Sequence, residues 1–336
     1  MARGLHGIAW LVLLAWLASS PACDSSKRAA RRDAREGEHL VLVGEGREVP
    51  TWPILQAQAA RFQKLYPSIR VDVIGPEKAS PSEQQRVMSG LLKQDADAIC
   101  VVPVDSSSLR TVIDKLVNSG RPVITIGRDV SGCRRNVYCG PSEVGLGKAA
   151  ATACSMALQG RLRTVMLLHR GQAGGAAQGR YFGFKEELPV YGNIRILGEA
   201  DCEGSPILAE RLVRARVRAY PRVGCWVFLE DWPLRAIRPE ERLLPIGCAM
   251  VLCNGYPRHF DRMRRGEVTV IVAFDFFRAV GDALSAASSL AEARGPEPTA
   301  FIGTPPEIIT PRNLDRYERR WESWKRGYPT PDAPPW

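Results

Sequence analysis

The sequence predicts an α/β fold of two doubly wound parallel-sheet lobes, of the Rossmann-like kind, joined by a multi-strand hinge. Short apolar runs rich in β-branched residues alternate with amphipathic helical stretches along most of the chain. That alternation is typical of parallel sheets with right-handed crossovers. The length agrees with this prediction, because 336 residues are enough for two domains, each with a sizeable core.

Composition and charge narrow the class of protein. A hydrophobic content of 45% and a charged content of 24% are ordinary for a soluble globular chain. The net charge of +10 is compatible with a nucleic acid or an anionic surface as partner. However, Arg211, Arg214 and Arg218 recur at helical spacing, as on a solvated helix face, and no nucleic-acid-binding motif accompanies them. We therefore expect no nucleic-acid partner.

The N-terminus has the pattern of an export signal. Arg3 supplies a positive start, residues 8–18 form an apolar run too short to span a bilayer, and the small residues 19–22 precede Cys23. The pattern resembles a bacterial lipoprotein signal, and it predicts a signal peptide over 1–22 and a lipid on Cys23. Ordinary signal-peptide cleavage, with Cys23 unmodified, is the alternative.

Residues 23–38 are basic and almost free of apolar side chains, which is typical of a flexible tether. A lipid and a basic tether together would hold the protein on a membrane by two signals. We therefore expect an exported protein of the cell envelope or periplasm that is anchored to a membrane through Cys23.

The first expected lobe begins with a strand over 39–43. Gly44 and Gly46 follow it, but the third glycine and the acidic partner of a dinucleotide-binding loop are missing, so we expect no dinucleotide cofactor. The remaining elements follow from apolar periodicity. We expect helices over 52–65, over 82–93 and up to Asn118, and strands over 71–74, 98–102, 123–126 and 136–139.

The second lobe repeats this rhythm. Pro141-Ser142-Glu143 is a helix-start signal, and it marks the point at which the chain enters this lobe. We expect helices over 144–159, 206–220, 257–265 and 276–293, and strands over 164–168, 194–197, 225–229, 249–253, 268–273, 302–304 and 307–310. The last of the helices would return to the first lobe.

The strand over 123–126 is apolar and β-branched throughout, which suits burial on both faces of a parallel sheet. Gly127, Arg128 and Asp129 follow at its carboxyl end. Because open parallel sheets bind ligands at the carboxyl ends of their strands, we expect Arg128 and Asp129 to meet one.

A longer segment around this strand resembles a known family. Its sequence is Pro-Val-Ile-Thr-Ile-Gly-Arg, ending at Arg128, and Gly-Leu-Gly-Lys-Ala-Ala follows from Gly145. Both pieces resemble the type I periplasmic solute-binding proteins of the sugar-binding class, such as ribose-binding protein. The resemblance covers residues 39–312 and implies the periplasmic-binding-protein type I fold. It implies an N-terminal lobe of 39–140 plus 276–303, a C-terminal lobe of 141–275 plus 304–320, and a loose tail over 321–336.

The resemblance also implies ligand-binding positions in the first lobe. In the family an aromatic residue after the first strand stacks on the sugar, and Trp52 occupies that place; packing beneath the loop is the alternative. Asp105 stands in the family's Pro-x-Asp position, although we favour a helix-capping role for it. Arg128 matches the family, whereas Gly127 replaces the aspartate that precedes it there.

Further positions follow in the second lobe. The family's ligand arginine falls on Gln178, with Arg180 two residues later, just before a matching Gly-Phe pair. A shorter neutral donor would replace a bidentate fork at that position. Strand ends carry the remaining candidates, of which only Asp231 matches the family: Glu230, Asp231, Asn254 and Asp275.

Eight cysteines follow Cys23. Export makes disulfides feasible, and the candidate pairs are Cys133–Cys139 and Cys248–Cys253, with Cys202–Cys225 as a third. Cys100 in a strand and Cys154 on a helix are expected to be buried free thiols. The sequence has no closely spaced ligand pair of the Cys-x-x-Cys kind, and we expect no bound metal.

These observations predict a binding protein rather than an enzyme. Glu230, Asp231 and Asp275 could form a hydrolytic carboxylate pair, but neither a nucleophile elbow nor a metal set accompanies them. We expect a monomer without a cofactor that binds a small polar ligand, most simply a sugar, between its lobes and delivers it to an ATP-driven membrane importer. Delivery to a membrane sensor receptor, and a homologue with a decayed ligand site, are the alternatives.

Overall fold

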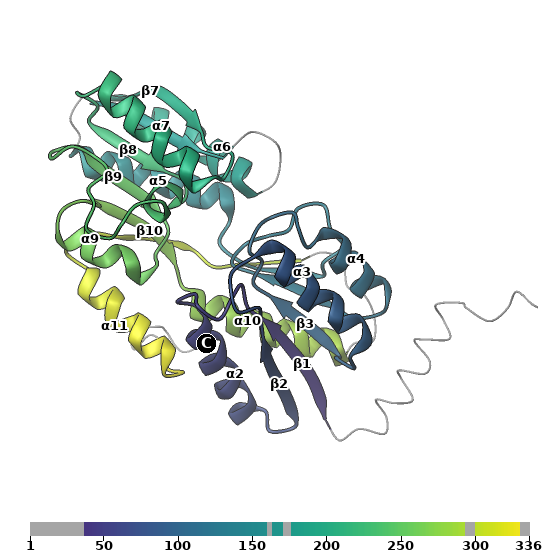
Figure 1. The fold of residues 1–336 in the computed structure, drawn as a ribbon. Helices are drawn as coiled ribbons and strands as arrows, with labels where there is room; N and C mark the ends of the chain where they lie inside the picture. The colour runs from purple at the N-terminus through teal and green to yellow at the C-terminus, as the bar shows by residue number, and fades with distance from the viewer. Residues whose placement is uncertain (1–36, 160–162, 171–175, 293–299, 330–336) are drawn as a thin grey trace, which may run out of the picture.

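The computed structural model describes residues 37–159, 163–170, 176–292 and 300–329, and it consists of two α/β lobes connected by crossing chains (Figure 1). The predicted fold class is confirmed. The signal peptide over 1–22, the lipidation site Cys23 and most of the tether lie outside the described residues.

The first lobe contains a six-stranded parallel sheet. Its order is β11-β5-β4-β3-β1-β2, and its strands are β1 (Glu38–Val43), β2 (Ile69–Ile74), β3 (Ala98–Val101), β4 (Val123–Ile126), β5 (Val137–Gly140) and β11 (Ala300–Gly303). Four α-helices cover it: α2 (Trp52–Leu65), α3 (Pro81–Gly90), α4 (Arg110–Asn118) and α10 (Phe276–Glu292), with the 3-10 turn η1 (Leu91–Lys93) after α3. Because β3, β4 and β5 are buried at every position, the apolar runs of the sequence form the centre of this sheet.

The second lobe also contains a six-stranded sheet, and one of its edge strands is antiparallel. The order is β12-β10-β9-β8-β6-β7, with β6 (Arg163–His169), β7 (Ile194–Asp201), β8 (Cys225–Phe228), β9 (Ala249–Cys253), β10 (Val270–Phe274) and the antiparallel β12 (Pro306–Ile309). Its helices are α5 (Glu143–Leu158), α6 (Ala176–Glu187), α7 (Pro206–Ala219), α8 (Trp232–Arg235) and α9 (Phe260–Arg264), with 3-10 turns η2 (Leu188–Val190) and η3 (Pro257–His259).

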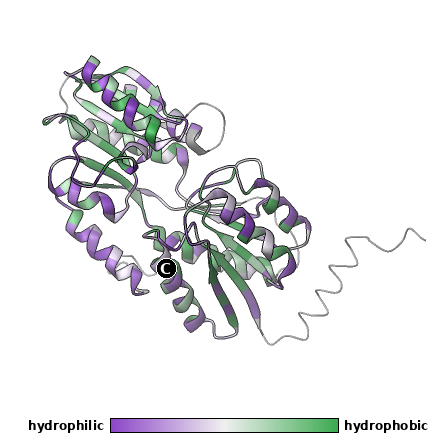
Figure 2. Ribbon diagram, viewed as in Figure 1, coloured by the Kyte–Doolittle hydropathy of each residue, from purple (hydrophilic) through white to green (hydrophobic). Residues whose placement is uncertain are grey.

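Helices cover both faces of each sheet, so each lobe has three layers. In the first lobe α2 and α10 pack on one face, and α3 and α4 on the other. In the second lobe α5 and α6 cover one face, and α7, α8 and α9 the other. Figure 2 shows hydrophobic residues concentrated along the strands, with hydrophilic residues on the outer helix faces.

Three chain segments cross between the lobes, and they place the carboxyl ends of both sheets face to face. They run from β5 into α5, from β10 into α10, and from β11 into β12. The crossings are tied to one another, since the backbone N–H of Thr304 donates to the carbonyl oxygen of Gly140 at 2.8 Å. A ligand at the strand ends would therefore lie between the lobes.

The C-terminal helix α11 (Leu314–Lys325) is an element that the sequence reading missed. Residues 321–336 were expected to be a loose tail, but Trp321 and Trp324 are fully buried, and the expected boundary at residue 320 falls inside the helix. The helix leaves the second lobe after β12 and packs against α2 of the first lobe (Figure 1). Its buried face therefore joins the two lobes.

The predicted disulfides are not formed, and all eight described cysteines are free thiols. The members of each predicted pair lie in different hydrophobic clusters, on opposite faces of a sheet. Cys139, Cys202 and Cys248 pack into the cluster shared by α2, α7 and α10, whereas Cys133, Cys225 and Cys253 pack into the clusters on the other faces. Cys100 and Cys154 are buried, as expected.

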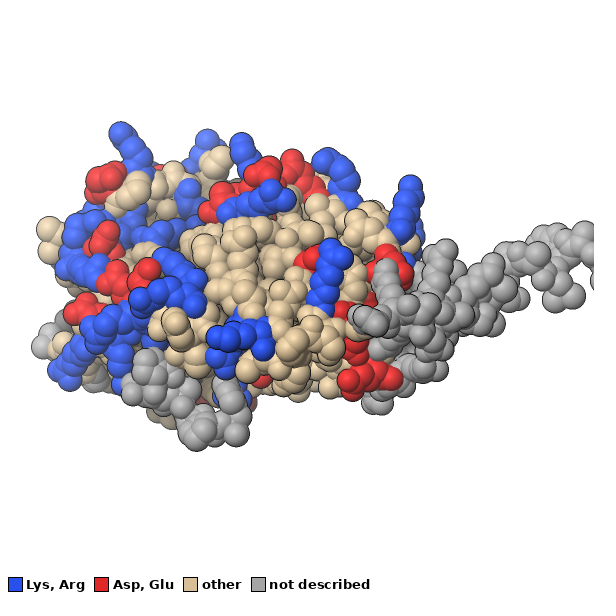
Figure 3. All heavy atoms as spheres, turned by 90° about the horizontal axis from the view of Figure 1, so that it is seen from below, with Lys and Arg blue, Asp and Glu red and all other residues tan. Residues whose placement is uncertain are grey.

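The surface mixes charges of both signs. On the face seen from below, Figure 3 shows Lys and Arg side chains most densely at the left, with acidic groups among them, beside a broad area of mostly uncharged residues. A search of the described residues for a helix long and apolar enough to cross a membrane finds none.

Candidate functional site

A pocket of about 80 Å³ lies between the lobes, at the carboxyl ends of the strands. Its polar lining comes from both lobes: Glu45 and Arg128 from the first, and Arg180, Glu230 and Asn254 from the second. Its aromatic lining consists of Tyr256, Phe274, Phe276, Tyr317 and Trp321. The predicted strand-end positions and the crossing segments thus meet at one place.

Arg128 reaches across the pocket from one lobe to the other. It follows β4 after Gly127, whose positive φ of +69° turns the chain and suits glycine. The Arg128 Nη1 atom donates to the carbonyl oxygen of Val104 at 2.7 Å, which fixes the guanidinium on its own lobe. Its Nη2 atom donates to Oε1 of Glu230 in the second lobe at 3.2 Å. This inter-lobe ion pair forms one wall of the pocket.

Glu230 is the centre of the ion network. Its Oε1 atom also accepts a hydrogen bond from Nη1 of Arg180 at 3.1 Å. Arg180 donates further to the carbonyl oxygen of Leu229 at 2.6 Å and, through Nε, to Oε2 of Glu143 at 2.7 Å. Burial raises the pKa of Glu143, and the charge of Arg180 only partly offsets that effect. The second carboxylate oxygen of Glu143 has no hydrogen-bond partner in the described structure.

Glu45 and Tyr256 form a second contact between the lobes. The hydroxyl of Tyr256 donates to Oε2 of Glu45 at 3.4 Å, and the hydroxyl of Thr51 donates to the same atom at 3.3 Å. Burial raises the pKa of Glu45, and the charges of Arg128 and Arg235 lower it by less. A buried carboxyl that is held by two neutral hydroxyls can exchange one of them for a ligand hydroxyl at little cost.

Asp231 is the centre of a second network inside the second lobe, and Arg235 joins it to Glu230, since the Nη2 atom of Arg235 lies 3.7 Å from Oε2 of Glu230. It is fully buried, its Oδ1 atom accepts from Nε of Arg235 at 2.5 Å, and its Oδ2 atom contacts Arg258 and lies 2.9 Å from Nε2 of His259. Burial alone would raise the pKa of Asp231, but the His259 hydrogen bond and the two arginine charges outweigh it and lower the pKa. Although the family pattern points to Asp231, it is Glu230 that lines the pocket.

Trp52, the expected aromatic platform, lies beneath a loop. A Cβ atom added at Gly44 or at Gly75 would lie 2.9 Å from its ring, and the guanidinium of Arg47 lies 5.7 Å from the ring centroid. Trp52 is absent from the pocket lining. Trp52 therefore packs beneath the loop, which is the alternative that the sequence left open.

Three predicted acidic residues organise turns instead of the pocket. Asp105 accepts hydrogen bonds from the backbone N–H groups of Ser107 and Ser108, each at 2.7 Å, in the turn before α4. Asp129 pairs with Arg135 through contacts of 2.5 and 2.6 Å. Asp275 accepts from the N–H of Arg278 at 2.9 Å and caps α10. Asp105 and Asp275 thus order the backbone before a helix, and Asp129 forms an ion pair with Arg135.

Gln178, which stands at the expected position of the ligand arginine, does not line the pocket, whereas Arg180, two residues later, does. The two residues lie on the same helix, α6, but two positions apart they face different directions. Asn254 lines the pocket, and its Oδ1 atom accepts from the N–H of Tyr256 at 3.1 Å. The pocket therefore has a guanidinium group on α6, although the sequence predicts a neutral donor there.

The sequence predicts neither Glu45 nor any of the five aromatic lining residues as part of the site. Glu45 stands between two glycines, and Phe274 and Phe276 flank the second crossing. Tyr317 and Trp321 lie beyond residue 312, where the family resemblance ends. The four-residue interval from Tyr317 to Trp321 was the available signal, because residues at that spacing share one face of a helix.

The chemistry of the site is that of binding. Its arginines and carboxylates are paired with one another, and its aromatic faces offer apolar contact. Among the described residues, no group of three or more histidine, cysteine, aspartate and glutamate side chains could hold a metal ion.

Comparisons with solved structures show the fold. An ABC transporter solute-binding protein from Burkholderia graminis, in complex with D-arabinose, has a TM-score of 0.68 at 18% identity, over 83% of this chain and 98% of that one. AraP, an arabinose-binding protein from Geobacillus stearothermophilus, has a TM-score of 0.67 at 16% identity, over 84% and 99%. The Caulobacter myo-inositol-binding protein, bound to myo-inositol, has a TM-score of 0.65 at 19% identity, over 84% and 96%.

Comparison with curated protein sequences gives no match. A family model, described as the periplasmic binding protein domain, matches residues 51–295. That match covers more than half of the chain and includes most of both lobes and two of the three crossings. The protein therefore belongs to the periplasmic binding protein domain family.

Proposed function

We propose that this protein binds a sugar or a related polyol between its lobes and presents it to an ATP-driven importer. The observation that carries the proposal is the 3.2 Å ion pair between Arg128 of the first lobe and Glu230 of the second, at the wall of the pocket. Groups from both lobes meet where a ligand would lie. A ligand that contacts both would therefore favour the closed arrangement.

The lining supports a polyhydroxylated ligand. Arginine and carboxylate groups bind hydroxyls through charge-assisted hydrogen bonds, and aromatic faces cover the apolar side of a sugar ring. Arg128 and Arg180 supply donors, Glu230 supplies acceptors, and the Asn254 amide can do both. With Glu45, the lining carries two positive and two ionisable acidic side chains, and this balance favours an uncharged ligand.

The solved structures support the same class of ligand, because two of them hold D-arabinose and myo-inositol. The import role is supported by the description of the Burkholderia graminis protein as a solute-binding protein of an ABC transporter. Since the family is one of binding proteins, the chain is a binding protein and not an enzyme.

Export and anchoring complete the proposal. Residues 1–22 direct secretion, Cys23 carries a lipid, and the basic tether allows the monomeric lobes to reach a membrane permease. Metabolic labelling with a radioactive fatty acid tests the anchor, since Cys23→Ala should abolish the label.

Calorimetric titration of the purified protein tests the ligand class. D-arabinose, D-allose, D-tagatose and myo-inositol serve as probes. Thermal unfolding of the same preparation gives a second readout, because a ligand at one hundred times its dissociation constant adds about 2.7 kcal/mol to the unfolding free energy. Arg128→Gln should weaken binding at least about tenfold, because a charged hydrogen bond contributes about 1.5–3 kcal/mol. Arg70→Gln, at an arginine whose side chain is 69% exposed, is the matched control and should bind normally. Failure of every sugar and polyol to bind the folded protein would contradict the proposal.

A further inference from the structure

The helix α11 brings a row of aromatic residues to the pocket. Leu314, Tyr317, Trp321 and Trp324 follow one another at intervals of three and four residues, so they share one face of the helix. That face is buried, whereas the intervening residues are mostly charged. The burial of two tryptophans and a tyrosine on a helix of 12 residues fixes its orientation.

Ion pairs hold α11 on the second lobe. Arg320 forms a two-pronged contact with Glu307 of β12, and Arg264 of α9 contacts Glu318 and lies 3.6 Å from Asp315. The ring of Tyr317 packs edge-on against Phe260 with centroids 5.7 Å apart. These anchors carry the following turn of the helix, with Trp321, over the pocket between the lobes.

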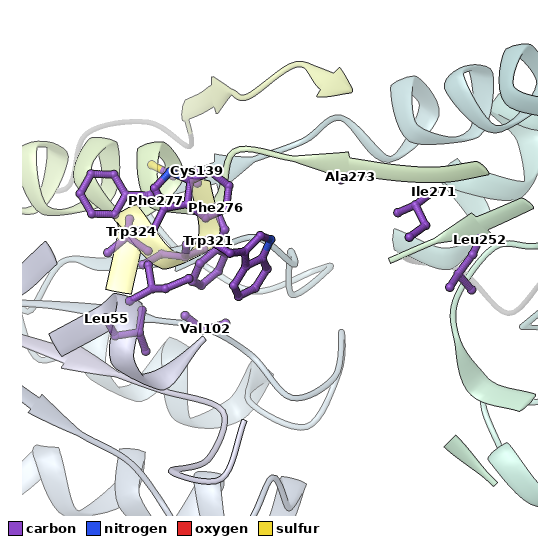
Figure 4. Close-up of a cluster of buried hydrophobic side chains, with 14 of the residues drawn as sticks. Leu55, Val102, Cys139, Leu252, Ile271, Ala273, Phe276, Phe277, Trp321 and Trp324 are labelled. Carbon is purple, nitrogen blue, oxygen red and sulfur yellow. The ribbon is translucent and has the colours of Figure 1, made fainter. Parts of the chain in front are cut away.

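Trp321 reaches the pocket with an unused donor. Its side chain lines the pocket together with Val102 and Phe276 of the first lobe, and Figure 4 shows the indole between these two side chains. Trp321 is only 2% exposed, yet its indole Nε1–H completes no hydrogen bond within the described residues, although the Tyr317 hydroxyl lies close to it. A buried donor without a partner costs free energy, and an acceptor placed in the pocket would recover it.

Tyr256, Phe274 and Phe276 bring no unused donor to the lining. The hydroxyl of Tyr256 donates to Glu45, and the guanidinium of Arg258 lies over the Tyr256 ring at 5.2 Å. Phe274 and Phe276 pack against each other with centroids 6.2 Å apart and have no polar atom to offer. The ring of Trp321 packs edge-on against Tyr256 with centroids 6.1 Å apart, and it brings to the same wall of the pocket an Nε1–H that has no hydrogen-bond partner among the described residues.

We propose that Trp321 is the aromatic platform of this binding site: the ring of the ligand packs on the indole, and a ligand oxygen accepts the Nε1–H. This inference rests on the proposed function and goes beyond it, because it assigns a specificity-determining role to the C-terminal helix. The residue supplies the stacking surface that Trp52, held beneath its loop, does not provide. A ring with one apolar face and an oxygen at its edge, as in a pyranose, meets both requirements.

The test uses the full-length protein, the four probes D-arabinose, D-allose, D-tagatose and myo-inositol, and two matched variants. Trp321→Phe removes the donor and part of the surface. Trp324→Phe is the control, because Trp324 lies on the same helix, is equally buried and also has an unpartnered indole N–H, but does not line the pocket. Calorimetry measures affinity, tryptophan fluorescence reports the ring contact, and thermal unfolding checks that both variants are folded.

For any probe that binds the wild type, Trp321→Phe should raise the dissociation constant about tenfold, and Trp324→Phe should change it by less than about twofold. The fluorescence change on sugar addition should disappear in Trp321→Phe and persist in Trp324→Phe. Sugar binding that is unchanged in Trp321→Phe overturns this inference and leaves the proposed function intact. If no probe binds the wild type, the proposed function fails and this inference fails with it. If Trp321→Phe does not fold, fluorine NMR of the 5-fluorotryptophan-labelled wild type decides, since no resonance shifted by sugar would overturn the inference.

Discussion

Glu230 and Asp231 are neighbours in the sequence, yet their side chains lie in different surroundings. Glu230 points into the space between the lobes and pairs with Arg128 of the opposite lobe. Asp231 points into its own lobe, where it is fully buried against Arg235, Arg258 and His259. Relative motion of the lobes can break the Arg128–Glu230 pair. The contacts of Asp231 lie within one lobe and move with it.

The difference shows how one strand end can serve binding and stability at once. The chain turns at the end of β8 (Cys225–Phe228) and starts α8 at Trp232, so successive side chains leave in opposite directions. The buried network fixes the turn, and the turn presents Glu230 to the pocket. A substitution at Asp231 should therefore lower the unfolding free energy more than the affinity for ligand. A substitution at Glu230 should do the reverse.

The largest effect is expected for Asp231→Asn. The substitution removes the charge that compensates Arg235 and Arg258 inside the lobe, and breaking a buried ion pair from one side costs about 3–5 kcal/mol. We expect the unfolding free energy to fall by about 3 kcal/mol in urea denaturation. Asp261→Asn, at an ion pair whose acidic side chain is 78% exposed, is the control, with a change below about 1 kcal/mol. Equal losses in both variants would remove the distinction between the two networks.

Glu230→Gln should produce the opposite balance. Arg180 keeps Glu143 as a partner and Arg128 keeps the carbonyl of Val104, so folding should lose only about 1 kcal/mol. The dissociation constant of the bound sugar should rise at least about tenfold, because the link between the lobes and a ligand acceptor are both lost. Calorimetry and denaturation on the same preparation measure the two quantities. A large stability loss with normal affinity would reverse the assignment.

The fold could be predicted in most respects because its signals are local. β3, β4 and β5 are short β-branched or apolar runs that are buried on both faces, as such runs predict. The helix α11 escaped prediction because its buried face consists of tyrosine and tryptophan among many charged residues. Figure 2 accordingly colours it as a largely hydrophilic segment. Burial of such a helix depends on the partner surfaces of two lobes, which no local pattern reveals.

The site could be predicted only to the level of strand ends. Arg128, Glu230 and Asn254 follow strands and do line the pocket. Which residue of a strand-end pair faces the pocket depends on the backbone turn, and for this reason Asp231 and Asp129 were misplaced. The disulfide predictions failed for a related reason, since spacing in sequence does not tell which face of a sheet a cysteine occupies.

The pH dependence of stability sharpens the comparison further, because Glu45 at the pocket and Asp231 in the buried network respond in opposite directions. Burial raises the pKa of Glu45 above its usual 4.5, so the folded state binds the proton more tightly and stability falls as pH rises through that window. The pKa of Asp231 is lowered below its usual 3.8, because opposite charges outweigh burial. Its contribution is present above pH 3.8 and is lost as the pH falls.

Glu45→Gln, which imitates the protonated carboxyl, should therefore stabilise the protein at pH 7. The advantage should disappear below about pH 4.5, where the carboxyl is protonated in both states. Asp231→Asn should instead differ most from the wild type at pH 7 and converge with it in acid. Urea denaturation at several pH values measures both curves. Parallel curves for the two variants would mean that both carboxyls sit in the same kind of environment.

The smallest effect is expected at the rim of the buried network. Arg258 contacts Asp231, but 42% of its side chain is exposed, so water can replace much of the interaction. Arg258→Gln should lower the unfolding free energy by only about 0.5 kcal/mol, against about 3 kcal/mol for Asp231→Asn. Urea denaturation of the double variant then separates two cases. If the losses are additive, the exposed arginine acts independently of the buried core. If removing Arg258 costs nothing once Asp231 is gone, the arginine acts through Asp231, and the network is a single unit that holds the turn behind Glu230.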